Sequence, residues 1–144
     1  MKQLVLDASI VSKWFIEEQH TNKALQIRDL YAQGKVDITL PVLILFELGN
    51  VLLRHPSITL EASKRAFEIF LDLGIKLKSF VETEALGKTL ENSRKFNITF
   101  YDASYVTLSK LQNAKLVTED KKLYDKIKNE IDVSLLTSLK PEDL

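Results

Sequence analysis

Residues 4–9 of this 144-residue chain read Leu-Val-Leu-Asp-Ala-Ser, three apolar residues followed directly by a carboxylate and, two positions later, a hydroxyl. A short apolar run of this kind predicts a buried strand, and a helical pattern follows at once over residues 9–16. A buried strand that passes directly into a helix is typical of α/β folds, in which helices connect parallel strands. The amino terminus therefore predicts the first unit of such a fold.

The same alternation continues along the chain. Further strands are predicted over residues 36–40, 75–79, 115–118 and 133–136, and further helices over residues 21–33, 42–54, 59–73, 81–95, 101–111 and 121–128. Strands separated by helices of this length predict a small parallel sheet of about five strands, covered by helices on both faces. The length suits one α/β domain that comprises residues 1–144.

The composition excludes several classes of protein. With 45% hydrophobic and 28% charged residues, the chain is an ordinary globular mixture. It has no cysteine, which excludes disulfides, zinc–thiolate sites and a cysteine nucleophile. Its net charge is zero, so the chain lacks the basic excess of simple nucleic-acid binders. A net charge of zero is compatible with a metal nuclease. No apolar run reaches the length of a membrane span and Asp7 comes too early for a signal peptide, so a soluble, cytoplasmic protein is expected.

Four carboxylates lie at positions where a fold of this kind usually has its functional site. Asp7 and Asp120 come at or just after the ends of predicted strands, Asp102 lies near the start of a predicted helix, and Glu47 lies within a strongly apolar helix. In an open α/β sheet, ligands bind at the carboxyl ends of the strands. We therefore expect these four acids at a common site.

Glu47 is the most informative of the four because nearly all its neighbours in the chain are apolar. That composition predicts a helix buried on most sides, in which a lone carboxylate is costly. Asn50 and Arg54 follow Glu47 at spacings of three and seven residues, on one stripe of the helix. A single polar stripe indicates that the helix borders a site, and an ion pair between Glu47 and Arg54 is an equal alternative.

Each aspartate also has a purely structural interpretation. Asp7, Asp102 and Asp120 stand at helix starts, where aspartate is a favoured cap, and each taken alone is better explained in that way. The cap interpretation does not explain why all four acids would lie close together, because like charges about 4 Å apart repel by roughly 1–4 kcal/mol per pair. A fold that gathers them needs a cation, and oxygen ligands favour Mg²⁺ or Mn²⁺, which can activate water against a phosphodiester.

Two hydroxyls and a third acid lie beside this set. Ser9 and Thr118 could orient carboxylates or bind a phosphate, although a local cap or turn is the more common role for each. Glu119 adjoins Asp120, but in strand conformation it would point to the other face of the sheet. We therefore rank Glu119 below Asp120 as a candidate ligand.

Four short motifs, in this order, resemble the PIN-domain family. They are Leu-Asp-Ala-Ser at 6–9, Glu-Leu-Gly-Asn-Val-Leu at 47–52, Tyr-Asp-Ala-Ser-Tyr-Val at 101–106 and Leu-Val-Thr-Glu-Asp at 116–120. Each motif is weak by itself. Their order and separations, which span almost the whole chain, form a fairly specific pattern.

The resemblance implies a PIN-like fold and metal-dependent hydrolysis of RNA phosphodiester bonds. It implies a catalytic set that binds Mg²⁺ or Mn²⁺, with two supporting polar residues: Asp7, Glu47, Asp102 and Asp120, with Asn50 and Thr118. Small single-domain members of this length are mostly VapC-like toxins of VapBC toxin–antitoxin pairs. The resemblance therefore also implies a homodimer that is silenced by a cognate VapB-like antitoxin.

Other functions fit the sequence less well. A response-regulator receiver needs adjacent acids after its first strand and an aspartate ending a middle strand, whereas Ala8 and Ser9 follow Asp7 and residues 75–79 end without an aspartate. A phosphatase of the haloacid-dehalogenase type needs a second aspartate where Ser9 stands. Two alternatives within the family stay open: an RNA-processing nuclease without an antitoxin, and a non-catalytic module that binds RNA or protein.

Two further groups of residues have open roles. Trp14, Phe15 and the amphipathic residues 59–73 could belong to the core, a dimer interface or an antitoxin groove. Helical spacing favours the core for Trp14. The basic cluster Lys121–Lys128 could meet the RNA backbone or form a solvated helix face.

Overall fold

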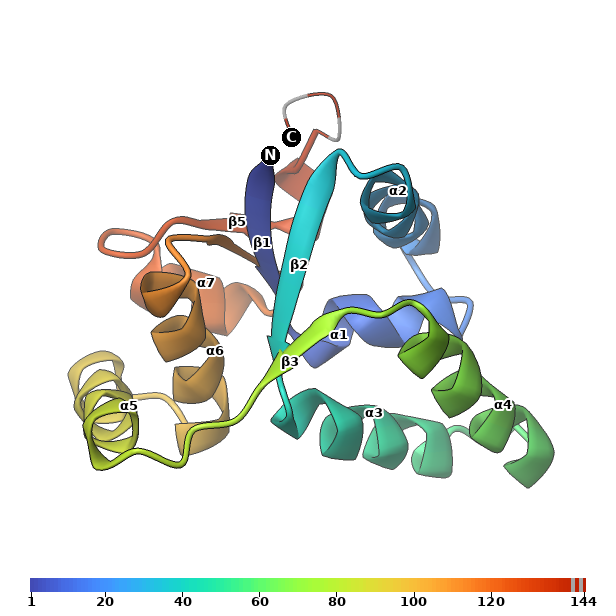
Figure 1. Ribbon diagram of the computed structural model, residues 1–144, viewed down its shortest axis with the longest axis horizontal. Helices are drawn as coiled ribbons and strands as arrows, with labels where there is room; N and C mark the ends of the chain where they lie inside the picture. The colour runs from blue at the N-terminus through green and yellow to red at the C-terminus, as the bar shows by residue number, and fades with distance from the viewer. Residues whose placement is uncertain (141, 143) are drawn as a thin grey trace.

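Strands and helices alternate along the chain in the computed structural model, which describes residues 1–140, 142 and 144 (Figure 1). The strands are β1 (Lys2–Leu6), β2 (Val36–Pro41), β3 (Lys76–Lys78), β4 (Lys115–Thr118) and β5 (Val133–Leu135). The helices are α1 (Ala8–Val11), α2 (Thr21–Ala32), α3 (Leu43–Arg54), α4 (Leu60–Asp72), α5 (Thr83–Phe96), α6 (Phe100–Leu111) and α7 (Lys121–Ile127). Two short 3₁₀ turns, η1 (Ser12–Trp14) and η2 (Leu136–Ser138), complete the described elements.

The five strands are parallel and lie in the order β3-β2-β1-β4-β5. Helix α6 packs against β1, β2 and β4, whereas α2 packs against β2 and α1 against β1 and β4. Figure 1 shows α5 and α6 on one side of β1 and β2, and α1 and α2 on the other. The predicted fold, a small parallel sheet of five strands with helices on both faces, is confirmed.

Burial explains the contrast between the central and edge strands. Leu4, Val5 and Leu6 of β1 are fully buried because helices cover both of its faces. At one edge, β3 presents the exposed side chains of Lys76 and Lys78. A short, charged edge strand is a common protection against pairing with another chain, and β3 is accordingly two residues shorter than the sequence predicts.

The order of the strands places two loops side by side at the centre of the sheet. The chain runs from β1 to β2 in one direction and reaches β4 on the opposite side of β1, so the strand order reverses between β1 and β4. Leu6 pairs with Val117, and the amide of Asp7 donates to the carbonyl of Val117 at 3.2 Å. In open α/β sheets, ligands bind at such a switch point, outside the carboxyl ends of the strands.

The first helix is shorter than predicted. The sequence predicts one helix over residues 9–16, whereas α1 ends at Val11 and continues as the tighter turn η1. Within η1, the indole nitrogen of Trp14 donates to the carbonyl of Ala24 at 2.9 Å, and the side chain is buried. The prediction that Trp14 belongs to the core is confirmed.

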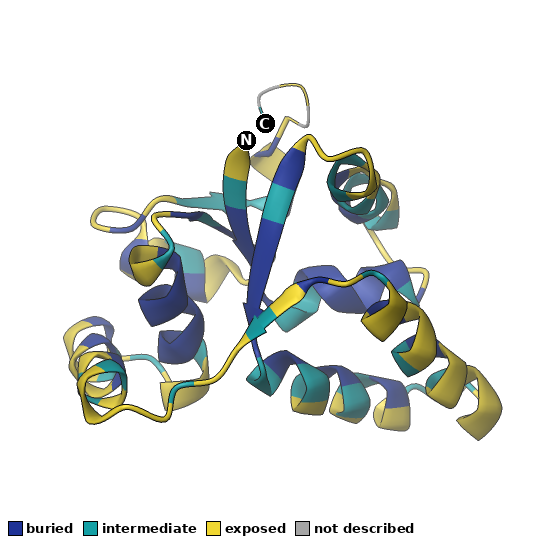
Figure 2. Cartoon of the chain, in the orientation of Figure 1, coloured by how far each residue is buried: buried dark blue, intermediate teal, exposed yellow. Residues whose placement is uncertain are grey.

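Helix α3 differs from its prediction because one of its faces has no cover. Ile44, Leu48 and Leu52 form a buried stripe, but Phe46 is 74% exposed and Leu53 is 83% exposed. The expectation that the helix is buried on most sides is therefore wrong. Figure 2 shows exposed segments along the outer sides of α3 and α4. None of the helices in residues 1–140 combines the length and the hydrophobicity needed to cross a lipid bilayer.

Candidate active site

Asp7 lies at the carboxyl end of β1 and is the most deeply buried of the four acids, with 8% of its surface exposed. Its carboxylate caps α1, since one oxygen accepts from the amide of Ser9 at 3.0 Å. The hydroxyls of Ser9 and Thr118 also donate to it, one to each oxygen. Burial raises the pKa of Asp7 to about 6 against the lowering effect of these bonds. Asp7 is thus both a helix cap and a buried acid at the switch point.

Glu47 extends from α3 toward α6, where it meets a residue that the sequence did not single out. The hydroxyl of Tyr105 donates to Oε1 of Glu47 at 2.5 Å. Desolvation raises the pKa of Glu47, the bond from Tyr105 lowers it, and the charge of Asp102 raises it again. Tyr105 follows Asp102 by three residues, a spacing that places both on one side of α6 and could have identified it.

The other members of the polar stripe on α3 do not reach Glu47. Among the described residues, no ion pair joins Glu47 to Arg54, so the predicted alternative for Glu47 is wrong. Asn50 is exposed, and the hydrogen bonds found in residues 1–140 do not connect it to the acids. In the part of the chain that the structure describes, the side chain of Tyr105 is the hydrogen-bond partner that orients Glu47.

Asp102 stands in the first turn of α6 but does not cap it, contrary to the cap interpretation. Thr99 is the cap, and its hydroxyl accepts from the amide of Asp102 at 3.0 Å. The half-buried carboxylate of Asp102 instead interacts with all three other acids: its charge raises the pKa of Asp7 and of Glu47. The pKa of Asp102 is itself raised by desolvation and by the charge of Asp120. Asp102 is the electrostatic centre of the four.

Asp120 begins α7 and is exposed. Its carboxylate accepts from the amide of Leu123 at 3.1 Å, which confirms that it serves as a cap. Its own amide donates to the hydroxyl of Thr118 at 3.0 Å. Thr118 therefore connects the carboxylate of Asp7 to the backbone of Asp120.

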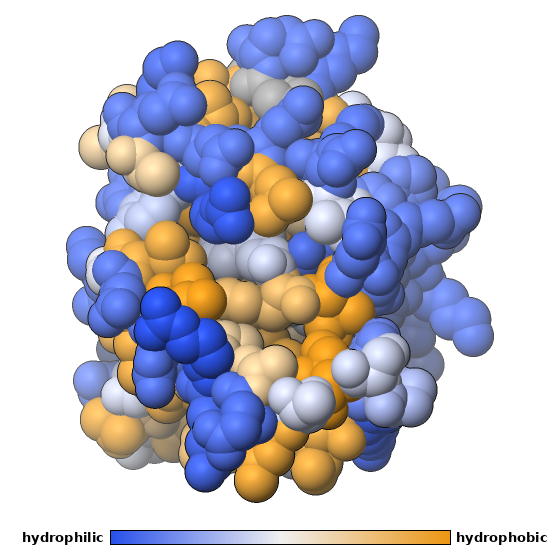
Figure 3. All heavy atoms as spheres, turned by 90° about the vertical axis from the view of Figure 1, so that its right-hand side faces the viewer, coloured by the Kyte–Doolittle hydropathy of each residue, from blue (hydrophilic) through white to orange (hydrophobic). Residues whose placement is uncertain are grey.

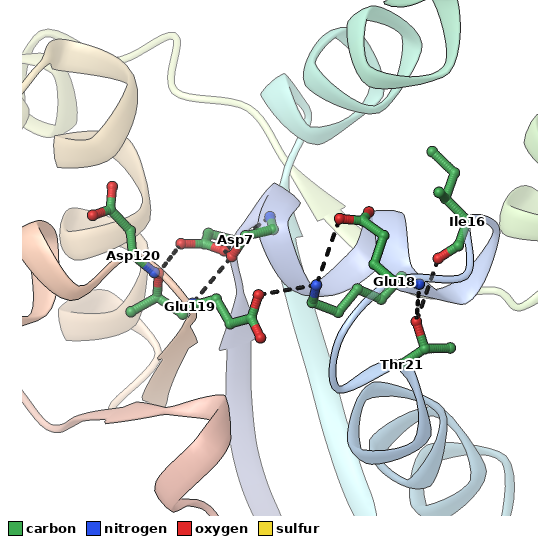
Figure 4. Close-up of polar contacts among 9 residues, drawn as sticks. Asp7, Ile16, Glu18, Thr21, Glu119 and Asp120 are labelled. Carbon is green, nitrogen blue, oxygen red and sulfur yellow. Dashed lines mark hydrogen bonds and ion pairs between the residues drawn. The ribbon is translucent and has the colours of Figure 1, made fainter. Parts of the chain in front are cut away.

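Glu119 points away from this set and pairs with a buried lysine. Lys13 of η1 is 4% exposed, and its ammonium lies 2.9 Å from Oε2 of Glu119 and 3.8 Å from Oε2 of Glu18. Figure 4 shows the carboxylate of Glu119 directed to the opposite side from that of Asp120. The predicted ranking of Glu119 below Asp120 agrees with this placement. Lys13 carried no signal in the sequence, because lysine is rarely buried.

The basic cluster Lys121–Lys128 is partly engaged in contacts of its own. Lys121 and Lys128 pair with Asp125 at 3.0 and 3.5 Å. Lys126 donates to the carbonyl of Asn97 at 2.8 Å, and its charge lowers the pKa of Asp102. Lys126 is thus a cation whose charge acts directly on the acidic set.

The acids fit a hard divalent cation in chemistry but are not drawn together around one. Every candidate ligand is a carboxylate or hydroxyl oxygen, the donor type that Mg²⁺ and Mn²⁺ prefer. Within the described part of the chain, no three histidine, aspartate or glutamate side chains are already spaced to hold one ion. Desolvation is the main cause of the raised pKa values of Asp7, Glu47 and Asp102, and repulsion between the acids adds to it. A bound cation would offset both effects.

Solved structures of low sequence identity share this fold. PAE2754 from Pyrobaculum aerophilum is 20% identical, with a TM-score of 0.68 over 95% of this chain and 91% of that one. VapBC2 from Rickettsia felis, solved with a DNA fragment from its promoter, is 17% identical, with a TM-score of 0.68 over 92% and 98%. VapC20 from Mycobacterium tuberculosis, a toxin that cleaves the sarcin-ricin loop, is 14% identical, with a TM-score of 0.66 over 89% and 95%.

Sequence comparison gives the family directly. No curated protein matches the chain. The family model of the PIN domain matches residues 4–129, a span that contains all four acids and runs from within β1 to beyond the end of α7. PIN domains are generally nucleases. Because the match covers most of the chain, the protein belongs to the PIN-domain family.

Proposed function

We propose that residues 1–144 form one PIN-like domain that hydrolyses RNA phosphodiester bonds with Mg²⁺ or Mn²⁺ and acts as the toxin of a VapBC pair. The proposed catalytic and metal-binding residues are Asp7, Glu47, Asp102 and Asp120, with Ser9, Asn50 and Thr118 in support. The observation that carries the proposal is the PIN-domain match over residues 4–129, which contains all four acids, in a sheet whose switch point lies between β1 and β4.

The residues of the proposed site have different roles, which depend on their surroundings. Ser9 and Thr118 hold the carboxylate of Asp7 from both sides, and Tyr105 holds that of Glu47. Asp120 is exposed and Glu47 and Asp102 are partly exposed, so an ion and a substrate can reach them from solvent. A divalent cation bound by these acids would supply positive charge to the phosphodiester and activate water for hydrolysis. Lys126, whose charge lowers the pKa of Asp102, would neutralise a phosphate of the RNA backbone.

An apolar surface between α3 and α4 supports the proposal that the protein binds a protein partner. A groove there is lined mainly by apolar side chains, including the exposed Leu53 and Leu60 and the partly buried Ile58 and Phe67. Figure 3 shows hydrophobic residues gathered on this side of the molecule. Exposed apolar patches of this kind mark interaction sites. We assign this groove to a VapB-like antitoxin, in keeping with structural neighbours that are toxin–antitoxin complexes, and we expect a cytoplasmic homodimer.

Cleavage of a total pool of transfer and ribosomal RNA by the purified protein tests the nuclease. The reaction is run with Mn²⁺, with Mg²⁺ and with EDTA, and Asp102→Asn is the inactive control. We expect cuts that require the metal and are absent from Asp102→Asn.

Two other results would change the assignment. If no RNA is cut but Mn²⁺ still binds, the substrate is narrower than the pool. If neither cleavage nor Mn²⁺ binding is found, the acids are caps and surface groups, and a non-catalytic binding module replaces the nuclease. Active cleavage by a protein that no antitoxin inhibits would favour an RNA-processing enzyme.

A further inference from the structure

An ion pair between a buried lysine and a partly exposed glutamate lies beside the acidic set, and its presence needs an explanation other than stability. The ammonium of Lys13 is almost completely withdrawn from water and contacts Oε2 of Glu119 at 2.9 Å. Its second partner, Glu18, lies farther away at 3.8 Å and is half exposed. Apolar residues of similar volume often stabilise a fold as well as a buried ion pair does, or better. A role in fixing the position of Glu119 accounts for a charge at this place.

Glu119 is attached at two points to the segment that follows β1. Its carboxylate pairs with Lys13 of η1, and its amide donates to the hydroxyl of Ser9 at 3.1 Å. That same hydroxyl donates to the carboxylate of Asp7. The turn after β4 is therefore fastened both to η1 and to the cap of α1, more than a hundred residues away in sequence (Figure 4).

Glu119 also stands between two residues of the proposed site. On one side, the hydroxyl of Thr118 donates to the carboxylate of Asp7. On the other, the amide of Asp120 donates to the hydroxyl of Thr118 at 3.0 Å. Because the three residues share one turn of backbone, a movement of Glu119 displaces both neighbours.

We propose that Lys13 is a positioning residue: by holding the carboxylate of Glu119 against η1, it fixes the turn between β4 and α7 and so keeps Thr118 and Asp120 in place relative to Asp7. Lys13 acts through Glu119, and not as a ligand of metal or RNA. The inference rests on the proposed function for the role of these acids. Whether Lys13 holds the turn between β4 and α7 can be measured without catalysis.

Three variants and a matched control test the inference. Lys13→Met removes the ammonium at nearly constant volume, Glu119→Gln removes the partner charge, and the third variant combines both changes. Lys115→Met is the control, because it breaks a similar ion pair, with Asp132 at 2.7 Å, at the opposite end of β4. Each protein is assayed for Mn²⁺ affinity by calorimetry, for kcat and KM on RNA, and for exchange of the Glu119 and Asp120 amide hydrogens.

We expect Lys13→Met to weaken Mn²⁺ binding and to lower kcat by about tenfold or more, as loss of a residue behind metal ligands commonly does. Glu119→Gln should cause a similar loss, and the double variant should be no worse than either single variant, because both changes remove the same tie. The amides of Glu119 and Asp120 should lose protection in all three. Lys115→Met should leave affinity, kcat and exchange unchanged.

Defined results overturn the inference. If Lys13→Met keeps the protection of both amides, Lys13 does not hold the turn, and if the losses of the single variants add, Lys13 acts by its own charge. If Lys13→Met does not fold, the double variant decides, because it removes both charges and leaves no buried charge without a partner. A wild-type protein that neither cuts RNA nor binds Mn²⁺ refutes the proposed function, while amide exchange still decides the role of Lys13.

Discussion

The hydroxyl of Tyr105 donates a 2.5 Å hydrogen bond to the carboxylate of Glu47 and thereby joins α6 to α3. Tyr105 is fully buried, and it lies one helical turn after Asp102. A single turn of α6 thus carries one acid of the candidate site and the group that orients another. Desolvation and the nearby charge of Glu47 raise the pKa of the Tyr105 phenol well above its ordinary value, so the hydroxyl remains a donor.

Loss of that hydroxyl should reduce both activity and stability. We expect Tyr105→Phe to lower the cleavage rate about tenfold and the free energy of unfolding by about 1–3 kcal/mol, the usual effect of losing a hydrogen bond to a charged group. Tyr31→Phe is the matched control, because it removes a 3.0 Å bond to the carbonyl of Leu73, between α2 and the end of α4. Urea unfolding and RNA cleavage measure both effects. Full activity of Tyr105→Phe would mean that Glu47 needs no fixed orientation.

The raised pKa of Asp7 predicts how the stability of the metal-free protein depends on pH. Its pKa is about 6 in the folded protein against 3.8 for an ordinary aspartate, so the folded state holds the proton more tightly than the unfolded state. The contribution of Asp7 to stability is therefore greatest below about pH 4, falls as the pH rises toward about 6, and stays reduced above it. The total change is about 3 kcal/mol.

Urea unfolding in EDTA from about pH 4 to about pH 7 tests this dependence, as the difference between wild type and Asp7→Asn. Asp125→Asn is a control that should not vary over this range, since the hydrogen bond from Lys121 lowers the pKa of Asp125. The contribution of Asp125 is fully present above about pH 4 and is lost only as the pH falls further. A difference for Asp7→Asn that does not vary with pH would show that Asp7 titrates normally.

Neutralising Asp102 should stabilise the metal-free protein and abolish stabilisation by Mn²⁺. Asp102→Asn removes both the desolvation of this carboxylate and its repulsion of the other acids. We expect a gain of about 1–2 kcal/mol in EDTA. Calorimetric melting with and without Mn²⁺ measures this, with Asp29→Asn on the surface of α2 as control. A variant that Mn²⁺ stabilises as much as wild type would remove Asp102 from the proposed ligands.

A charge in the groove between α3 and α4 should separate antitoxin binding from catalysis. Leu53 is 83% exposed, so Leu53→Glu should change the free energy of unfolding by no more than about 0.5 kcal/mol. We expect it to abolish inhibition by the proposed VapB-like antitoxin while RNA cleavage continues. Leu111→Glu, at the exposed end of α6, is the matched control and should remain inhibited. Equal inhibition of both variants would place the antitoxin elsewhere.

Local sequence patterns determined the order of strands and helices and the choice of the four acids. The run Leu4–Leu6 is apolar at every position, which suits a strand covered on both faces. Asp7 and Asp120 follow strands, and parallel strands end at one edge of a sheet, so their convergence could be inferred before the fold was known. The motifs around Glu47 and Asp102 added the other two acids through their order along the chain.

Only the tertiary structure decided how those acids are held and which surfaces stay open. The bonds from Tyr105 to Glu47 and from Lys13 to Glu119 join residues far apart in sequence, so they depend on how helices pack and not on any local pattern. Apolar periodicity likewise predicted a buried α3, because it measures a tendency to leave water and not the presence of a neighbour to pack against. Which face finds a neighbour is settled only when the remaining helices are in place.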